Sequence, residues 1–312
     1  MLQNVLTVVI PVFNGENYIS RALLCLQNQT WQNFNVLIIN DCSTDSTKEI
    51  IESFAENNEK ISVINLSHNH GVSYCRTLGI KQCKTPYITF LDHDDWLDIN
   101  TYECCFKSVE IDSDVLIFGL NYEYLDIDVS ETKYFYKNDF KVSGDYALKI
   151  YGHTIKDSFK ITPIINNKIY RLDFLKMHEI VFNEHIRYQE DDIFTFEVLL
   201  QAKKVMFIAN CKYHYFQNPK SVIHTVSELS VTHFVGAYSA LKTYLDSHNC
   251  FDKYKNEYYL KFKSSLKGVI HRTVHYSKNQ SEMQYLLALL YKQLNESVNI
   301  EDFLAYCDLS NC

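Results

Sequence analysis

Three groups of acidic residues in this chain stand next to apolar segments that read as buried strands or an amphipathic helix. Asp92, Asp94 and Asp95 follow the segment PYITFL, and Asp41 follows NVLIIN. The run Glu190-Asp191-Asp192 precedes an amphipathic stretch. Carboxylate oxygens are the ligands that hard divalent cations prefer, and such cations accept phosphate oxygens as further ligands. The cluster at 92–95, at a strand end that neighbours that of Asp41, therefore indicates a site for a metal ion and a phosphate-bearing ligand.

Each group alone also has an ordinary structural explanation. An aspartate-rich turn after a strand commonly caps a helix or faces solvent, and Asp41 could cap the helix that follows it. The run at 190–192 could complement the positive end of a helix dipole. The functional interpretation depends on joint placement, because the carboxyl ends of neighbouring parallel strands meet at one edge of a sheet.

Glycine-rich phosphate loops are missing, since the sequence contains neither GxGxxG nor GxxxxGK[ST]. The phosphates of a bound nucleotide would need neutralising in another way. A divalent cation held by the acidic cluster at 92–95 would do so, and we expect Mn²⁺ or Mg²⁺ as cofactor.

Strand and helix signals alternate over the first 120 residues, which predicts a parallel sheet covered by helices on both faces. Apolar runs predict strands at 6–13, 35–40, 61–66, 86–91 and 114–120, and helical periodicity predicts helices at 17–29, 44–56 and 71–84. Residues 121–220 are less regular, with one strong helix at 192–202 followed by the strand-like VMFIA. From about residue 225 the pattern is helical to the end.

Charge is distributed unevenly along the chain. The net charge of −8 argues against a nucleic-acid partner. Residues 253–278 nevertheless hold seven Lys and Arg against Glu257 alone, a local +6, interleaved with Tyr254, Tyr258, Tyr259 and Phe262. Three interpretations stay open: attraction to an anionic membrane surface, which we prefer, packing on the rest of the chain, or homo-oligomerisation through C-terminal helices.

The ten cysteines include no CxxC pair, and no run of 18 apolar residues occurs. We expect reduced thiols in a cytoplasmic protein, peripheral on the inner face of the membrane.

The chain resembles glycosyltransferase family 2 in the order and spacing of four segments, VVIPVFNGENYISRALLCLQNQT, VLIINDCSTDST, GVSYCRTLGI and YITFLDHDDWLD. The resemblance continues through NNKIYRLDFL, YQEDDIFTFEVLLQAKKVMFIAN and YHYFQNPKSVIH, and so covers about residues 5–225. The second half looks most like bacterial transferases that build lipooligosaccharide, capsule or teichoic acid.

This resemblance implies the GT-A fold, an α/β architecture with a mostly parallel, Rossmann-like sheet flanked by helices. It places a catalytic domain at 1–225, with a nucleotide-binding half at 1–120 and an acceptor half at 121–225, before a helical extension at 226–312. The implied activity is inverting transfer of a hexose or N-acetylhexosamine from a UDP-sugar to a hydroxyl of a bacterial surface glycan, free or lipid-linked.

By the same resemblance, Phe13 stacks on the uracil where the family usually has Tyr, and Asp41 accepts a hydrogen bond from the base. Arg76 contacts the nucleotide, and Asp92 binds the ribose or the donor sugar. The implied set of donor-binding residues is completed by Pro11 and His93. The family usually has two acids at the second strand end and often Gly after them, whereas this chain has Asn40, Asp41 and Cys42.

The resemblance also assigns the metal ion and the chemistry. Asp94 ligates the metal, and His224 completes its shell or closes over the diphosphate. Asp191 is the general base, and Glu190 orients donor or acceptor. The residues expected to meet acceptor or diphosphate are Lys168, Arg171 and Ser221, with surface ion pairing an equal alternative for the first two. Asp95 is expected to cap the next helix.

Two other functions fit parts of the pattern. A sugar-nucleotide pyrophosphorylase needs a glycine-rich basic loop after the first strand, and PVFNGEN is not one. A binding or assembly protein with a decayed site would have little reason to retain Asp41, Asp92, Asp94 and Asp191 together.

Overall fold

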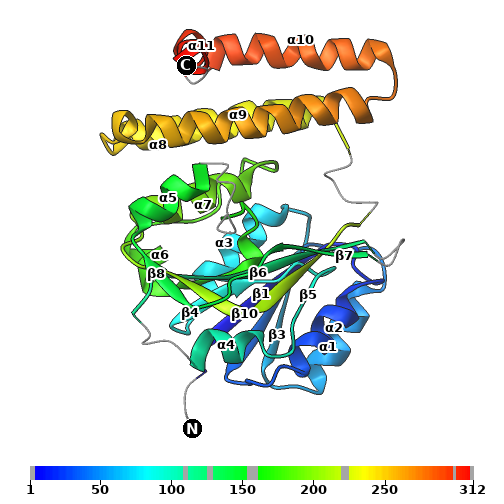
Figure 1. Cartoon of the computed structure of the whole chain (residues 1–312). Helices are drawn as coiled ribbons and strands as arrows, with labels where there is room; N and C mark the ends of the chain where they lie inside the picture. Colours follow the sequence, from blue (N-terminus) through cyan, green and yellow to red (C-terminus); the bar gives the residue numbers. More distant parts are fainter. Residues whose placement is uncertain are drawn as a thin grey trace.

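A ten-stranded mixed sheet lies at the centre of the molecule, in the strand order β3-β2-β1-β4-β9-β6-β10-β5, with β7 paired to β6 and β8 to β10. The computed structural model describes residues 4–107, 112–124, 129–152, 161–218, 225–297 and 300–309. Figure 1 shows the sheet flanked by helices and covered on one side by a separate layer of C-terminal helices.

The first four strands are parallel and alternate with helices, as the sequence predicts. They are β1 (Leu6–Val12), β2 (Phe34–Asn40), β3 (Ile61–Asn65) and β4 (Tyr87–Phe90), and the helices are α1 (Ile19–Gln27), α2 (Thr47–Glu56) and α3 (Val72–Gln82). Val8 and Ile10 face the cluster that contains α1 and α2, whereas Val9 faces that of α3. Gly79 lets α3 approach β1 closely, because a Cβ there would stand 2.6 Å from a methyl of Val9.

The second part of the sheet is built around one reversed strand. β9 (Lys168–Arg171) is antiparallel to both β4 and β6 (Val115–Tyr124), and β10 (Val205–Phe216) is parallel to β6. The strands β6 and β10 therefore run in the same direction as the first four. The short strands β5 (Trp96–Leu97), β7 (Val129–Tyr134) and β8 (Phe140–Val142) pair antiparallel with them. The remaining elements of this part are α4 (Thr101–Lys107), α5 (Gly144–Gly152), the 3₁₀ turn η2 (Ile165–Asn167), α6 (Leu172–Met177) and α7 (Glu190–Gln201).

Four helices form the C-terminal layer: α8 (Glu228–Ser247), α9 (Phe251–Tyr276), α10 (Gln280–Ser297) and α11 (Ile300–Leu309). α8 begins after a capping box at Ser227 and Ser230. In Figure 1 the pair α8 and α9 lies against the side of the molecule that carries α5 and α7. One continuous apolar cluster contains Val9 of the sheet, Phe234 of α8 and Leu286 of α10. The layer therefore shares its core with the sheet. The predicted division at residue 225 stays a prediction.

Four aromatic residues of the basic stretch, Tyr254, Tyr258, Tyr259 and Phe262, are buried, whereas Tyr276 is exposed. Tyr258 and Phe262 are fully covered and Tyr259 is 1% exposed, which favours packing over insertion into a membrane. Attraction of the exposed lysines to an anionic surface, and oligomerisation through these helices, stay predictions. None of the helices in the described ranges is long and apolar enough to cross a membrane.

Candidate active site

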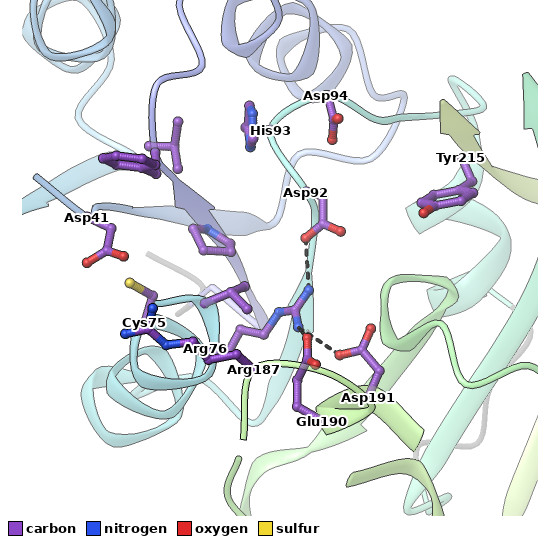
Figure 2. A pocket seen from close by; sticks show the side chains of 14 residues that line it. Asp41, Cys75, Arg76, Asp92, His93, Asp94, Arg187, Glu190, Asp191 and Tyr215 are labelled. Atoms are coloured by element: carbon purple, nitrogen blue, oxygen red, sulfur yellow. Dashed lines mark hydrogen bonds and ion pairs between the residues drawn. The ribbon is translucent and has the colours of Figure 1, made fainter. Parts of the chain in front are cut away.

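A cavity of about 410 Å³ opens at the carboxyl ends of β1, β2 and β4 (Figure 2). Its lining consists of Pro11, Val12, Phe13, Asp41, Val72, Cys75, Arg76, Asp92, His93, Asp94, Arg187, Glu190, Asp191 and Tyr215. Every residue predicted to bind the donor or to act in catalysis lines this cavity, and so does the predicted metal ligand Asp94. Parallel strands bring these distant segments together because their carboxyl ends share one edge of the sheet.

The turn after β2 is fixed by its own polar side chains. Asn40 accepts a hydrogen bond from Ser43 N at 3.1 Å. Asp41 is 4% exposed, and its two oxygens accept the backbone N–H groups of His70 and Gly71, each at 2.8 Å. Asp41 thus ties the end of β2 to the start of α3. Cys42 adopts φ 62°, the left-handed conformation that Gly adopts without strain.

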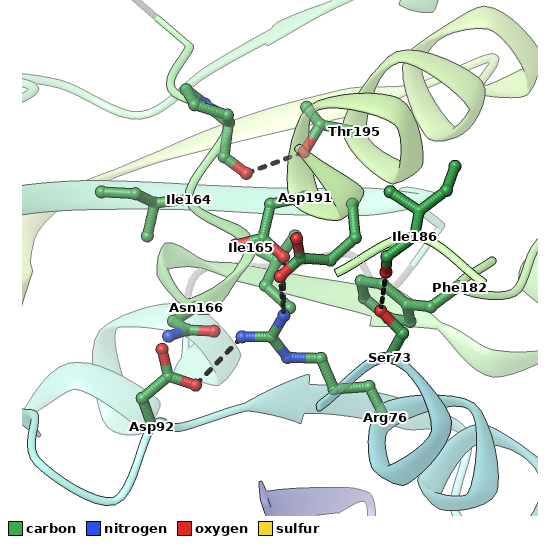
Figure 3. A network of polar contacts seen from close by, with 12 residues as sticks. Ser73, Arg76, Asp92, Ile164, Ile165, Asn166, Phe182, Ile186, Asp191 and Thr195 are labelled. Carbon is green, nitrogen blue, oxygen red and sulfur yellow. Dashed lines mark hydrogen bonds and ion pairs between the residues drawn. The ribbon is translucent and has the colours of Figure 1, made fainter. Parts of the chain in front are cut away.

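Arg76 joins acidic residues that are far apart in the sequence. Its guanidinium donates to Asp92 Oδ1 at 3.1 Å, to Glu190 Oε1 at 3.2 Å and to Asp191 Oδ1 at 2.7 Å (Figure 2). Figure 3 shows the contacts with Asp92 and Asp191 from another side. The residue is 3% exposed, and its guanidinium lies 5.5 Å from the centre of the Phe182 ring. Its predicted contact with the nucleotide stays a prediction. The structure gives it three carboxylate partners.

The carboxyl pair at the start of α7 is poised to titrate near neutral pH. Burial raises the pKa of Asp191 to about 6, although Arg76 beside it acts in the opposite direction. Burial and the neighbouring Asp191 raise the pKa of Glu190 to about 8. The side chains are still 28% and 13% exposed, so both groups remain open to the cavity. Such a pair suits proton transfer.

Asp192, the next residue, points away from the cavity. It accepts hydrogen bonds from Tyr238 Oη at 2.9 Å and Ser265 Oγ at 2.8 Å, and it pairs with Lys261 Nζ at 2.8 Å. Although burial opposes its charge, Lys261 and these hydrogen bonds lower the pKa of Asp192. The three acids of this run therefore have different positions: Glu190 and Asp191 line the cavity, and Asp192 anchors α7 to the C-terminal layer.

The acidic cluster after β4 is divided as well. Asp94 faces the cavity, and its Oδ2 accepts a hydrogen bond from Asn218 at 3.3 Å. Asp95 is fully buried and accepts Phe216 N at 2.7 Å together with the hydroxyl of Tyr213. The prediction that Asp95 caps the next helix is therefore wrong. It holds the loop after β4 against β10.

Two predicted contacts with acceptor or diphosphate are contradicted. Lys168 is fully buried and donates to Thr162 O at 2.9 Å and Asn167 Oδ1 at 3.0 Å, and burial lowers its pKa to about 7. Arg171 pairs with Asp114, and its register with Tyr87 places it at the opposite end of β4 from Asp92. Neither lines the cavity. Ser221 and His224 lie outside the described residues.

Five lining residues were not predicted: Val12, Val72, Cys75, Arg187 and Tyr215. Arg187 stands three residues before Glu190, and Tyr215 follows His214 in the segment YHYF. Their closeness in sequence to segments already expected at the site is the one sequence feature that could have identified them. His214 itself lies between Asp98 and Glu123, at 2.8 and 2.6 Å, and has a structural role.

Comparison with known proteins identifies the family of this chain. A profile described as glycosyl transferase family 2 matches residues 7–165, just over half of the chain. Glycosyltransferase GlyG of Streptococcus pneumoniae is 27% identical over 231 residues, covering 73% of this chain and 76% of GlyG. The poly(ribitol-phosphate) β-N-acetylglucosaminyltransferase TarS of Staphylococcus aureus is 28% identical over 216 residues, 67% of this chain and 35% of TarS.

The fold is also found in solved structures. The crystal structure of S. aureus TarS residues 1–349 in complex with UDP-GlcNAc has a TM-score of 0.60 and 19% identity, covering 93% of this chain and 89% of that one. The chain therefore has the GT-A fold. With the matched profile and the sequence relatives, this makes it a glycosyltransferase that belongs to glycosyl transferase family 2.

Proposed function

We propose that the protein is an inverting, divalent-cation-dependent transferase. It moves a hexose or N-acetylhexosamine from a UDP-sugar to a hydroxyl of a bacterial surface glycan. The donor class is supported by the UDP-GlcNAc complex of the fold relative. The acceptor class is supported by sequence relatives named as poly(ribitol-phosphate) β-N-acetylglucosaminyltransferase and poly(ribitol-phosphate) β-glucosyltransferase.

The meeting of Asp92, Glu190 and Asp191 on the single guanidinium of Arg76 is the observation that carries the proposal. It brings the loop after β4, which is the candidate donor site, against the carboxyl pair at the start of α7. Asp191 Oδ2 accepts no hydrogen bond from any described residue, so it is open to a proton from a bound hydroxyl.

In the proposed reaction, the acceptor oxygen attacks the anomeric carbon from the face opposite the diphosphate. A bond forms between that oxygen and the carbon, and the bond from the carbon to the diphosphate oxygen breaks. The hydroxyl proton passes to Asp191, and UDP leaves with the bonding electrons. General-base assistance of this kind is worth roughly 10²–10⁴ in rate. Attack from the opposite face inverts the anomeric configuration.

The donor-side residues suit a nucleoside diphosphate. Phe13 is 45% exposed at the wall of the cavity, as a ring that stacks on a base requires. The described residues contain no cluster of three or more His, Cys, Asp or Glu arranged to hold a metal ion. A cation that takes one or two carboxylates, here Asp94 and Asp92, with phosphate oxygens and water still fits this set. When bound, it would offset the charge of the leaving diphosphate.

Titration of the protein with UDP in a calorimeter, with and without Mn²⁺, tests the proposal. Wild-type protein should bind UDP more tightly with Mn²⁺, and Asp94→Ala should remove that difference. Asp173→Ala, which removes the same charge from the exposed surface of α6, should keep it. The metal-dependent proposal fails if UDP affinity does not respond to Mn²⁺. UDP binding without sugar transfer to any acceptor would favour a binding or assembly protein.

Cytoplasmic location, peripheral membrane association and a lipid-linked acceptor belong to the same proposal. The charge of the exposed Lys267 of the basic stretch supports attraction to an anionic membrane surface.

A further inference from the structure

A second cavity, of about 270 Å³, adjoins the first and shares three lining residues with it: Arg187, Glu190 and Asp191. Its other walls come from the segment Pro163–Ile164, from Tyr188, Gln189 and Asp192, and from Arg272 on α9. Asp191 therefore stands between the two cavities, where a group bound in either one can reach its carboxylate.

The walls of the second cavity are held by specific contacts. Thr195 Oγ1 on α7 donates to Pro163 O at 3.1 Å, which fixes the 163–164 segment against that helix (Figure 3). The pair between Asp192 and Lys261, at 2.8 Å, fixes α9 against the same helix. The cavity is thus built jointly by the catalytic part and the C-terminal layer.

The charges around this cavity are divided between paired acids and arginines without acidic partners. Glu190 and Asp191 are bonded to Arg76, and Asp192 to Lys261. Within the described residues, Arg187 and Arg272 make no ion pair with a carboxylate. Burial lowers the pKa of Arg272, so its guanidinium would gain from an anion bound beside it.

We propose that the second cavity is the acceptor site and that Arg187 and Arg272 select an acceptor that carries phosphodiester groups near the accepting hydroxyl. This assignment rests on the proposed function, since it takes the first cavity as the donor site. A guanidinium forms two parallel hydrogen bonds with a phosphate, which suits a chain of alternating polyol and phosphate. The accepting hydroxyl then lies at Asp191, facing the donor sugar.

Binding of a short glycerol phosphate oligomer to protein saturated with UDP and Mn²⁺ tests the assignment, because UDP keeps the phosphates of the oligomer out of the first cavity. Calorimetry should show binding of the oligomer but not of a neutral oligosaccharide of similar length. Arg272→Gln should weaken oligomer binding about tenfold and leave UDP affinity at the wild-type value. Arg187→Gln should weaken both, since Arg187 lines both cavities.

Lys267→Gln is the matched control, because it removes one charge from an exposed position of α9 that lines neither cavity. The assignment is overturned by unchanged oligomer affinity in Arg272→Gln, by an equal loss in Lys267→Gln, or by inorganic phosphate binding as tightly as the oligomer. Absence of UDP binding to wild-type protein would instead reject the proposed function. The two failures are therefore distinguishable.

Discussion

At the scale of single residues, the carboxyl groups of the active site depend on one buried cation. Arg76 is 3% exposed and carries Asp92, Glu190 and Asp191 on two nitrogens. Three acids this close would repel one another if the guanidinium were absent. Arg76 therefore lets Asp92 and the carboxyl pair of α7 lie close together, and it leaves the second oxygen of Asp191 free for the proposed proton transfer.

Replacing Asp191 with Asn should reduce turnover at least a hundredfold while UDP affinity stays unchanged. The amide keeps the shape of the side chain but does not accept the proton of the hydroxyl. Initial rates of UDP release with saturating donor and acceptor give the first quantity, and calorimetry gives the second. Asp173→Asn controls for loss of a surface charge. Turnover within a few fold of wild type would exclude Asp191 as the general base.

The pH dependence of turnover follows from the raised pKa of Asp191. Only the deprotonated carboxylate is a base, and burial raises its pKa to about 6. Turnover should therefore decrease as the pH falls through about 6 and level off above that value. Rates measured from pH 5 to 7.5 in wild type and Asp191→Asn provide the check. An unchanged acid limb in the variant would assign the titration to another group.

At the scale of secondary structure, α7 serves two parts of the molecule with three consecutive acids. Glu190 and Asp191 line the first cavity, while Asp192 enters the C-terminal layer and meets α8 and α9 through Tyr238 and Lys261. The 3.6-residue period of a helix makes this division natural, because consecutive side chains point in directions about 100° apart.

Changing Lys261 to Met should lower the free energy of unfolding by about 3 kcal/mol, because Asp192 would keep a buried charge without its cation. Asp192 is 4% exposed and Lys261 9%. Denaturant unfolding gives the difference, and Lys267→Met, on the exposed side of the same helix, should change it little. Equal stability of Lys261→Met and wild type would show that the pair does not hold α9 to α7.

Patterns within the sequence predict the ends of the first four strands well, and these ends position Asp41, Asp92 and Asp94. The strands β1, β2 and β4 are buried on both faces, so their apolar runs stop where the sheet stops. The pattern is less informative for β10, predicted as VMFIA but extending to Phe216 beyond an irregularity between Phe207 and Lys212. Polar residues in that extension interrupt the apolar run.

The positions of individual polar residues are a second feature that local sequence does not predict reliably. Lys168 and Arg171 stand in NNKIYR beside expected site segments, yet β9 is the reversed strand of the sheet. Strand direction depends on which neighbours pair, and local sequence does not encode it. Asp95 was misassigned for a similar reason, because its partners Tyr213 and Phe216 are more than a hundred residues away.

At the scale of the whole molecule, the C-terminal helices are part of the same folded body as the sheet. The apolar cluster that begins at Val9 continues through Phe234 and Tyr258 to Leu286. The buried aromatic residues of the basic stretch, among them Tyr258 and Phe262, belong to this cluster. Their burial in the core accounts for these aromatic residues without any contact with lipid.

The placement of Asp191 and Asp192 side by side has a mechanical consequence. Asp191 is the proposed general base and Asp192 is paired with Lys261 of α9, so a single peptide unit connects the proposed catalytic carboxylate to the C-terminal helices. If Asp191 is the general base, a displacement of α9 relative to α7 would change the orientation of its carboxylate without any ligand entering either cavity. The proposed reaction is thereby coupled to the packing of the C-terminal helices.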